Sequence, residues 1–220
     1  MRKIGLGVIG LGVMGQNHVK VYAEHPLGEL IAVCDIKENL AKETAERYKV
    51  KYYVDYYEML KDPRIDAVSV VVPDFLHKEP VIAAAEAGKH ILCEKPLATK
   101  VEDAEEMVRA AEKAGVTLMV SFHNRWNPPF ALTKEAAEKG ELGKPLHAYV
   151  RLSDTIYVPT KMLSWASKSS VLWFLGSHST DLVRWIFNDE VYEVYAISGM
   201  DVLSSMGIKT PDFYQYTLRF

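Results

Sequence analysis

Cysteine is scarce in this sequence of 220 residues, with Cys34 and Cys93 as its two examples. They lie far apart and show no metal-ligand spacing, so we expect two reduced cysteines, no disulfide framework and no metal site. Long apolar runs are also missing, which argues against a transmembrane helix. The apolar segment near the N-terminus, residues 4–10, is too short and too rich in glycine for the hydrophobic region of a secretory signal. We therefore predict a cytoplasmic protein with no membrane partner.

An excess of basic charge is missing as well. Lys and Arg number 26 against 29 Asp and Glu, which gives a formal net charge of −3. The basic residues are scattered among acidic ones, as on solvated helix faces, whereas a nucleic-acid binder clusters them on one face. We expect no nucleic-acid partner. Hydrophobic residues make up 49% of the chain, an ordinary proportion for a globular protein with a core.

The first half of the chain alternates strand and helix patterns. The expected strands are 3–9, 30–34, 67–72, 90–93 and 117–121, and the expected helices are 15–24, 38–48, 79–87 and 101–114. The strands are continuously apolar, which is typical of a sheet covered on both faces. Strand–helix alternation then predicts a doubly wound α/β domain with a parallel sheet and right-handed crossovers.

The pattern changes after Asn124. The segments 147–154, 193–198 and 213–220 alternate apolar and polar residues like half-exposed strands, while 157–170 is irregular and 172–187 is helical. We expect a dinucleotide-binding domain over 1–123 and an α+β domain with a largely antiparallel open sheet over 124–220. The chain ends inside the last expected strand, and an unpaired terminal strand is an aggregation liability. We therefore expect the second domain to be incomplete.

Residues Gly10 to Gly15 read G-x-G-x-x-G, with an expected strand directly before and an expected helix directly after. Gly10 suits the tight turn, Gly12 the close approach of a pyrophosphate, and Gly15 the close packing of helix on strand. Val13 and Met14 open the helix, whose free N–H groups and partial positive charge attract phosphate. The loop predicts a dinucleotide site.

Asp35 ends the second expected strand, 20 residues beyond Gly15. A carboxylate at this point accepts hydrogen bonds from both ribose hydroxyls and repels a 2′-phosphate. NAD is therefore expected in preference to NADP, although Lys37 lies close enough to weaken the repulsion.

Glu94, Lys95 and Pro96 follow a buried strand, at the edge where parallel sheets bind ligands. Pro96 lacks an amide donor and holds Lys95 out of the helical region. From these residues alone, a ligand-binding lysine and a salt-bridged loop ended by proline remain equal alternatives.

Several motifs, in this order along the chain, resemble those of the glucose–fructose oxidoreductase, inositol dehydrogenase and rhizopine-catabolism proteins, the Gfo/Idh/MocA family. They are the glycine loop, residues 73–77, 87–98, 124–128 and 176–181, and Trp185. The resemblance implies a Rossmann domain followed by an α+β domain whose large open sheet forms the oligomer interface. It therefore implies a homo-oligomer, a dimer or tetramer, and members usually longer than 220 residues.

The resemblance also implies an enzyme. Lys95 would reach both the cofactor and the substrate hydroxyl, and His178 would be the second catalytic group. Pro73, His77 and Glu94 would lie along the nicotinamide side of the cofactor. The expected activity is NAD-dependent hydride transfer at a secondary alcohol of a sugar, inositol or related polyol.

One residue departs from the family's pattern, Asp-x-Gly-x-His before the second catalytic group. Phe174 stands where the aspartate is usual, ahead of Gly176 and His178. Asp181, one helical turn further, either holds the imidazole or has a purely structural role. The lost carboxylate fits one alternative, an NAD-binding regulatory protein without catalysis. A further alternative, which the resemblance implies, is an NAD-dependent glycosidase.

The remaining residues of interest receive structural interpretations. We expect no catalytic role for His18, His25, His90 and His123, and packing at a domain edge for Tyr52, Tyr53, Tyr56 and Tyr57. Trp165 and Trp173 either wall a sugar site or belong to the core. The segment 155–170 is a candidate lid.

Overall fold

The structure is a computed structural model that describes residues 2–220. The chain forms two compact units, one ending at Ser121 and the other running from Phe122 to Phe220. Within the described range, no helix is long and apolar enough to cross a membrane. No group of three or more His, Cys, Asp or Glu side chains in that range is placed to hold a metal ion.

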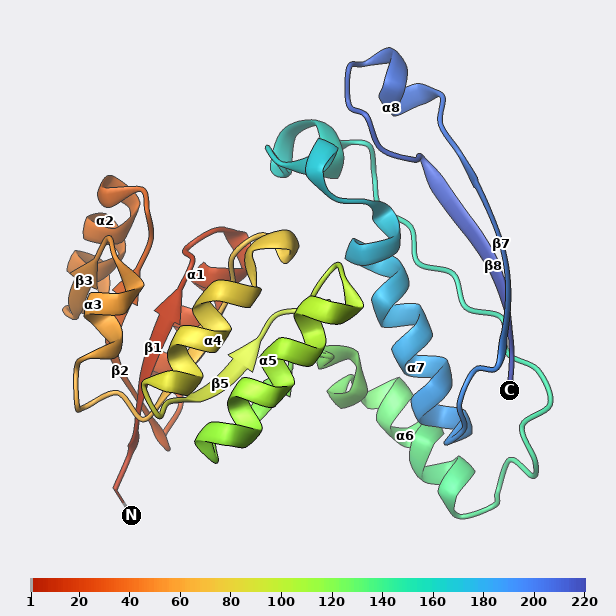
Figure 1. The fold of residues 1–220 in the computed structure, drawn as a ribbon. Coiled ribbons are helices and arrows are strands. Elements are labelled where there is room, and N and C mark those ends of the chain that lie inside the picture. The colour runs from red at the N-terminus through yellow and green to blue at the C-terminus, as the bar shows by residue number, and fades with distance from the viewer. Residues whose placement is uncertain (1) are drawn as a thin grey trace. The chain divides into compact units, whose positions relative to one another are not determined.

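The first unit is built on a six-stranded sheet with the order β3-β2-β1-β4-β5-β6, in which every pair of neighbours is parallel. Its strands are β1 (Ile4–Ile9), β2 (Gly28–Cys34), β3 (Lys51–Tyr53), β4 (Ala67–Val70), β5 (His90–Cys93) and β6 (Leu118–Val120). Its helices are α1 (Val13–Glu24), α2 (Glu38–Tyr48), α3 (Tyr56–Leu60), α4 (Lys78–Glu86) and α5 (Val101–Ala114). The expected doubly wound parallel sheet is confirmed (Figure 1).

Helices cover both faces of this sheet. Because successive strand residues point to opposite faces, neighbouring residues pack against different helices. Val8 and Val33 pack in a buried cluster with residues of α1 and α2. Their neighbours Ile9 and Cys34 pack in a second buried cluster with residues of α3, α4 and α5. The near-continuous apolar character of the strands therefore follows from burial on both faces.

The winding of the sheet reverses beside β1. The chain first adds β2 and β3 on one side of β1, and then adds β4, β5 and β6 on the other. Such a switch point leaves a crevice at the carboxyl ends of the two central strands, where ligands bind in open α/β sheets. The register aligns Cys34, Ile9, Val70 and Cys93 across β2, β1, β4 and β5. The residues that follow each of them therefore meet at one edge.

The second unit is α+β, as expected. It contains α6 (Pro128–Glu138), α7 (Ser177–Phe187), the short α8 (Val202–Ser205), and the strands β7 (Glu193–Gly199) and β8 (Phe213–Arg219). Single helical turns occur at His123–Trp126, Val158–Met162, Ala166–Lys168 and Leu172–Gly176. β7 and β8 pair antiparallel over their whole length, from Glu193 opposite Arg219 to Gly199 opposite Phe213.

One expected strand is wrong. Residues 147–154 carry no regular secondary structure and are largely exposed, although apolar and polar residues alternate there. A strand needs a neighbour that accepts its backbone hydrogen bonds. In the described part of the chain, β7 and β8 pair only with each other, and this segment joins no sheet. The structure also adds elements that we did not expect from the sequence: β3, α3, α6 and α8.

Candidate cofactor and catalytic site

The glycine loop connects β1 to α1, and packing explains two of its glycines. Gly10 has a φ of +93°, and a Cβ there would lie 2.5 Å from the carbonyl oxygen of Val71. A Cβ at Gly15 would lie 2.0 Å from the carbonyl oxygen of Gly10. A side chain at either position would therefore force the loop and helix apart.

Packing does not explain Gly12. A Cβ at this position would meet no protein atom within 4 Å. Gly12 is the N-cap of α1, and no side chain caps the helix there, so the first-turn N–H groups have no side-chain acceptor at the cap. Exposed Val13 and Met14 follow directly. The open space and the uncapped helix end together fit the pyrophosphate of a dinucleotide.

Asp35 follows β2 and lies beside this loop. One carboxylate oxygen accepts a hydrogen bond from the backbone nitrogen of Leu11 at 2.8 Å, and the other accepts one from the backbone nitrogen of Lys37 at 2.8 Å. The carboxylate therefore joins the glycine loop to the start of α2. Each oxygen keeps a lone pair for a ribose hydroxyl.

His77 anchors two loops at the carboxyl edge of the sheet. Its side chain is 1% exposed. Nε2 lies 3.0 Å from the carbonyl oxygen of Val72, and Nδ1 lies 2.8 Å from that of Pro96 and 3.2 Å from that of Leu97. Burial lowers the pKa of His77, against the raising effect of these carbonyls. The ring thus joins the segment after β4, which contains Pro73, to the segment after β5.

Glu94 and Lys95 follow β5 directly. Glu94 is 5% exposed, and its Oε2 accepts a hydrogen bond from the backbone nitrogen of Lys95 at 3.2 Å. The backbone nitrogen of Glu94 still pairs with β4, donating to Val70 at 2.9 Å. The peptide bond between Lys95 and Pro96 is cis. The two hydrogen bonds of Glu94 hold the start of this segment at the edge of the sheet, one strand beyond the switch point between β1 and β4.

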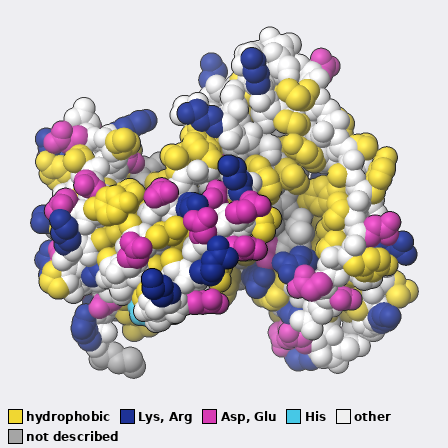
Figure 2. All heavy atoms as spheres, viewed as in Figure 1, with side chains coloured by type: hydrophobic (Ala, Val, Ile, Leu, Met, Phe, Trp, Pro, Cys, Tyr) yellow, Lys and Arg dark blue, Asp and Glu magenta, His cyan; other side chains and the backbone are white. Residues whose placement is uncertain are grey.

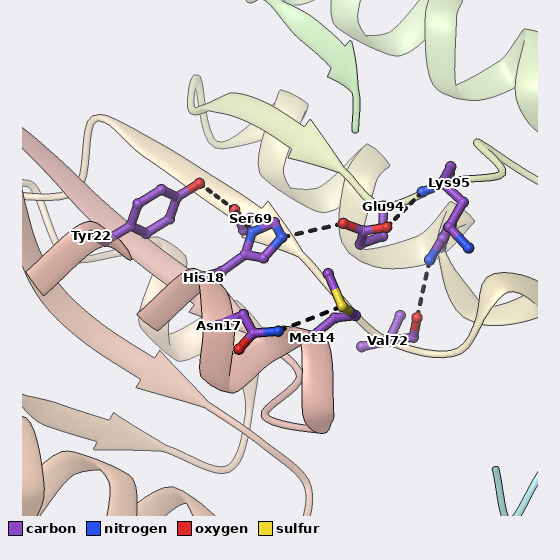
Figure 3. Close-up of polar contacts among 9 residues, drawn as sticks. Met14, Asn17, His18, Tyr22, Ser69, Val72, Glu94 and Lys95 are labelled. Atoms are coloured by element: carbon purple, nitrogen blue, oxygen red, sulfur yellow. Dashed lines mark hydrogen bonds and ion pairs between the residues drawn. The ribbon is translucent and has the colours of Figure 1, made fainter. Parts of the chain in front are cut away.

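A buried polar network lies behind Glu94 (Figure 3). His18 of α1 bridges it, with Nδ1 2.9 Å from the hydroxyl of Ser69 and Nε2 3.2 Å from Oε1 of Glu94. The hydroxyl of Tyr22, one turn along α1, also hydrogen-bonds to Ser69. Burial tends to raise the pKa of Glu94, but hydrogen bonds from His18, Ser121 and the Lys95 backbone outweigh it and lower the pKa. Glu94 is thus held as a carboxylate.

His178 lies in the second unit, as the second residue of α7. Its side chain is buried, at 6% exposed. The ring of His123 packs edge-on against it, with ring centroids 4.7 Å apart and an interplanar angle of 66°. Phe174 precedes it in the turn Leu172–Gly176, which leads directly into α7.

The carboxylate of Asp181 binds Arg125. Nε and Nη2 of Arg125 donate to its two oxygens at 2.9 and 2.5 Å. The guanidinium carbon also lies 5.7 Å from the ring centre of Phe122 and 5.6 Å from that of Trp185. Of the two roles considered for Asp181, these bonds favour the structural one: it fixes the turn that carries His123 against α7.

The structure brings the predicted residues of the first unit together along one edge of its sheet, in the order Asp35, Gly10, Pro73 and Glu94 with Lys95. Sequence reasoning missed the partners behind them, His18, Ser69 and Tyr22. The spacing of His18 and Tyr22 places both on one face of α1, which was an available indication. Nothing local in the sequence links that face to Glu94.

Comparison with known proteins agrees with this geometry. Residues 4–122 match the model of the oxidoreductase family with an NAD-binding Rossmann fold, and residues 130–220 match the GFO/IDH/MocA C-terminal domain. The chain belongs to the Gfo/Idh/MocA family. Its first unit is therefore an NAD-binding Rossmann domain.

Individual members of the family are similar over most of this chain. An uncharacterised oxidoreductase of Bacillus subtilis is 33% identical over 89% of the chain and 57% of its own length. A myo-inositol 2-dehydrogenase of Thermotoga maritima is 34% identical over 92% of the chain and 60% of its own length. A solved structure of levoglucosan dehydrogenase in complex with NADH and levoglucosan is 31% identical, with a TM-score of 0.88 over 100% of this chain and 64% of that one. The chain thus spans about three fifths of the length of these relatives.

Proposed function

We propose that this protein is an NAD-dependent oxidoreductase that transfers a hydride between a secondary alcohol carbon of a sugar, inositol or related polyol and the nicotinamide. The observation that carries the proposal is the alignment of four strand ends, Cys34, Ile9, Val70 and Cys93. Asp35, the glycine loop and the Glu94–Lys95 pair each follow one of these strand ends, so they lie along one edge of the sheet. The similarity to a myo-inositol 2-dehydrogenase and to a levoglucosan dehydrogenase supports the substrate class.

The catalytic roles go to Lys95 and His178. NAD, when bound, accepts the hydride of the alcohol carbon. Lys95 holds the substrate hydroxyl and helps to remove its proton, and His178 accepts or relays that proton. The protein contributes orientation and proton transfer, and the hydride chemistry belongs to the cofactor.

We assign the cofactor-binding roles to residues at successive strand ends along the carboxyl edge of the sheet. Gly10, Gly12 and Gly15 with Val13 and Met14 receive the pyrophosphate, and Asp35 holds the ribose and favours NAD over NADP. Pro73, His77, Glu94 and Lys95 form the nicotinamide side. Both ring nitrogens of His77 face backbone carbonyls, so its support of the nicotinamide comes through the loops that it joins.

Phe174 favours a second candidate, an NAD-binding regulatory protein without turnover, because it replaces the carboxylate usual in the family. An NAD-dependent glycosidase, which would release an aglycone without net NADH, is a further alternative that the resemblance to the family leaves open. Lys95 and His178 are both present, and we therefore rank the dehydrogenase first.

We further propose that the protein is a homo-oligomer, a dimer or tetramer. Tyr195, Ile197 and Phe213 lie on one face of the β7–β8 pair and are 70%, 45% and 49% exposed. Hydrophobic side chains are visible over this part of the molecule in Figure 2. Exposed apolar patches of this kind mark interaction sites. Light scattering on the wild-type protein and an Ile197→Arg variant tests this, since a monomeric wild type would contradict it.

A cytoplasmic location also remains a proposal, supported by the two free, buried cysteines. It is tested by fractionating cells that produce the protein.

The deciding experiment mixes the protein and NAD⁺ with a panel of inositols, anhydrosugars, sugars, sugar acids and polyols, and follows NADH absorbance. Lys95→Met is the test variant, and exposed Lys100→Met is the matched control. Turnover on one compound class that is lost in Lys95→Met and kept in Lys100→Met supports the dehydrogenase. A protein that binds NADH and turns over nothing favours the regulatory role, and release of aglycone without NADH favours the glycosidase.

A further inference from the structure

His18 lies on the helix that receives the cofactor's phosphates and contacts the motif that carries the catalytic lysine. It sits three residues after Gly15 in α1. Its side chain is largely buried, and its two ring nitrogens contact Ser69 at 2.9 Å and Glu94 at 3.2 Å. Ser69 is fully buried in β4. The ring therefore connects α1, β4 and the end of β5 inside the first unit.

For a neutral His18 ring, one arrangement of protons satisfies every bond of this network. The carboxylate of Glu94 only accepts, so Nε2 of His18 carries a proton and donates to it. In a neutral ring Nδ1 then accepts, and the hydroxyl of Ser69 donates to it. The oxygen of Ser69 in turn accepts from the hydroxyl of Tyr22. Each proton is used once, and every bond is directed toward Glu94.

The carboxylate of Glu94 links His18 to the backbone of Lys95. Its Oε1 faces His18 at 3.2 Å, and its Oε2 accepts from the backbone nitrogen of Lys95 at 3.2 Å. A buried carboxylate that loses one donor rotates toward other donors or takes up a proton. Either change weakens the bond that holds the Lys95 backbone. Figure 3 shows the ring of His18 and the Lys95 amide on opposite sides of the same carboxylate.

We propose that His18 is a positioning residue: through Glu94 it fixes the backbone of Lys95 relative to the helix that receives the cofactor's pyrophosphate. The consequence for the reaction rests on the proposed function of Lys95. The positioning itself is a property of the first unit, and it is measured without turnover.

Two substitutions separate this role from a general packing role. His18→Gln places an amide nitrogen near the position of Nε2 and keeps the bond to Glu94. His18→Asn places its amide near the position of Nδ1, reaching Ser69 and losing Glu94. His25→Asn, at the exposed end of α1, is the matched control.

We expect His18→Asn to lower kcat about 10- to 100-fold and His18→Gln to keep most of the wild-type kcat, because small misplacements of reacting groups have effects of this size. NADH affinity should stay within about threefold of the wild type, a small change in binding free energy.

The second readout is the backbone amide of Lys95, observed by NMR through its chemical shift and hydrogen-exchange rate. We expect faster exchange in His18→Asn than in His18→Gln, the control and the wild type. Equal exchange in all four proteins overturns the inference, whatever the turnover. Equal losses of kcat in the Asn and Gln variants overturn it as well.

A failed proposed function gives a different pattern. In that case the wild type turns over no substrate, while the amide of Lys95 still responds to His18→Asn. If the Asn variant does not fold, Ser69→Ala replaces it. This change removes the donor to Nδ1. We then expect a smaller acceleration of hydrogen exchange at the Lys95 amide. Adding His18→Gln to Ser69→Ala should not increase that exchange rate further. No acceleration in Ser69→Ala contradicts the proposal.

Discussion

Asp35 accepts a hydrogen bond from the backbone nitrogen of Leu11 at 2.8 Å, so the residue that we propose to hold the ribose also shapes the glycine loop. Asp35→Asn leaves one acceptor oxygen for two backbone donors, Leu11 and Lys37. We expect NADH affinity to fall about tenfold or more, since a hydrogen bond to a charged group contributes about 1.5–3 kcal/mol. NADPH affinity should fall less, because the charge that repels a 2′-phosphate is gone.

Fluorescence titration with both reduced cofactors measures this preference. Glu38→Gln, which removes an exposed carboxylate on α2, is the control. An unchanged ratio of NADH to NADPH affinity in Asp35→Asn would remove Asp35 from the specificity site.

The glycine loop offers a second, paired prediction. Gly12→Ala adds a methyl group into open space, and Gly12 has a φ of −62° that alanine adopts freely. The thermal midpoint should therefore stay close to that of the wild type, while NADH affinity falls by about tenfold or more, because the methyl group occupies the approach of the pyrophosphate.

Gly15→Ala should behave in the opposite way. Its methyl group would lie 2.0 Å from the carbonyl oxygen of Gly10, so the loop and α1 must move apart. We expect a loss of about 1–3 kcal/mol in the free energy of unfolding, measured by urea denaturation. A Gly12→Ala protein with normal NADH affinity would contradict the assignment of the phosphate site.

The fold of the first unit was largely predictable, because its central strands are buried on both faces and two of its helices, α4 and α5, are followed by a glycine with positive φ. The helix expected over 101–114 agrees with α5, which Gly115 ends with a φ of +66°. Short elements such as β3 carry too few residues for a periodicity. In the second unit, alternation over 147–154 predicts a strand, but the segment has no pairing partner in a sheet among residues 2–220, and pairing decides whether a strand forms.

The site was predictable where a strand leads directly into it. Asp35, Gly10 and Glu94 each follow a strand end, so a parallel sheet brings them together whatever the side chains do. The supporting contacts were not predictable. His18 and Glu94 are 76 positions apart, and Arg125 and Asp181 are 56 apart. Such pairs depend on the completed tertiary structure.

The pair of Arg125 and Asp181 gives a stability prediction for the second unit. Asp181 is buried, and Arg125→Leu would leave its carboxylate without these two bonds. Removing one partner of a buried pair costs about 3–5 kcal/mol, but the arginine side chain is 35% exposed, so solvent screening reduces our expectation to about 2 kcal/mol.

The double variant Arg125→Leu/Asp181→Leu should recover part of this loss, because no buried charge then remains. Urea unfolding of the wild type, both single variants and the double variant gives the coupling energy. Strictly additive losses would show that the two side chains do not stabilise each other.

The last prediction concerns pH and His77. Burial lowers the pKa of this imidazole below its ordinary value of 6.5, and the backbone carbonyls around it offset the effect only in part. The unfolded chain therefore binds more protons than the folded one in the range between the two pKa values. The contribution of His77 to stability is complete above the unfolded pKa and is lost as the pH falls through the folded pKa.

We expect the free energy of unfolding to decrease as the pH is lowered from about 7.5 to about 5.5, the range in which histidines titrate. His77→Gln should be less stable at neutral pH by about 1–3 kcal/mol, since its amide lies near the position of Nε2, beside Val72, and leaves the carbonyls of Pro96 and Leu97 without a donor. Its pH slope over the same range should nevertheless be flatter, because no ring remains to titrate. His25→Gln, on the exposed end of α1, should keep the wild-type slope. If His77→Gln keeps the full wild-type dependence of unfolding free energy on pH, that dependence belongs to other groups. Protonation of His77 would then make no contribution to stability.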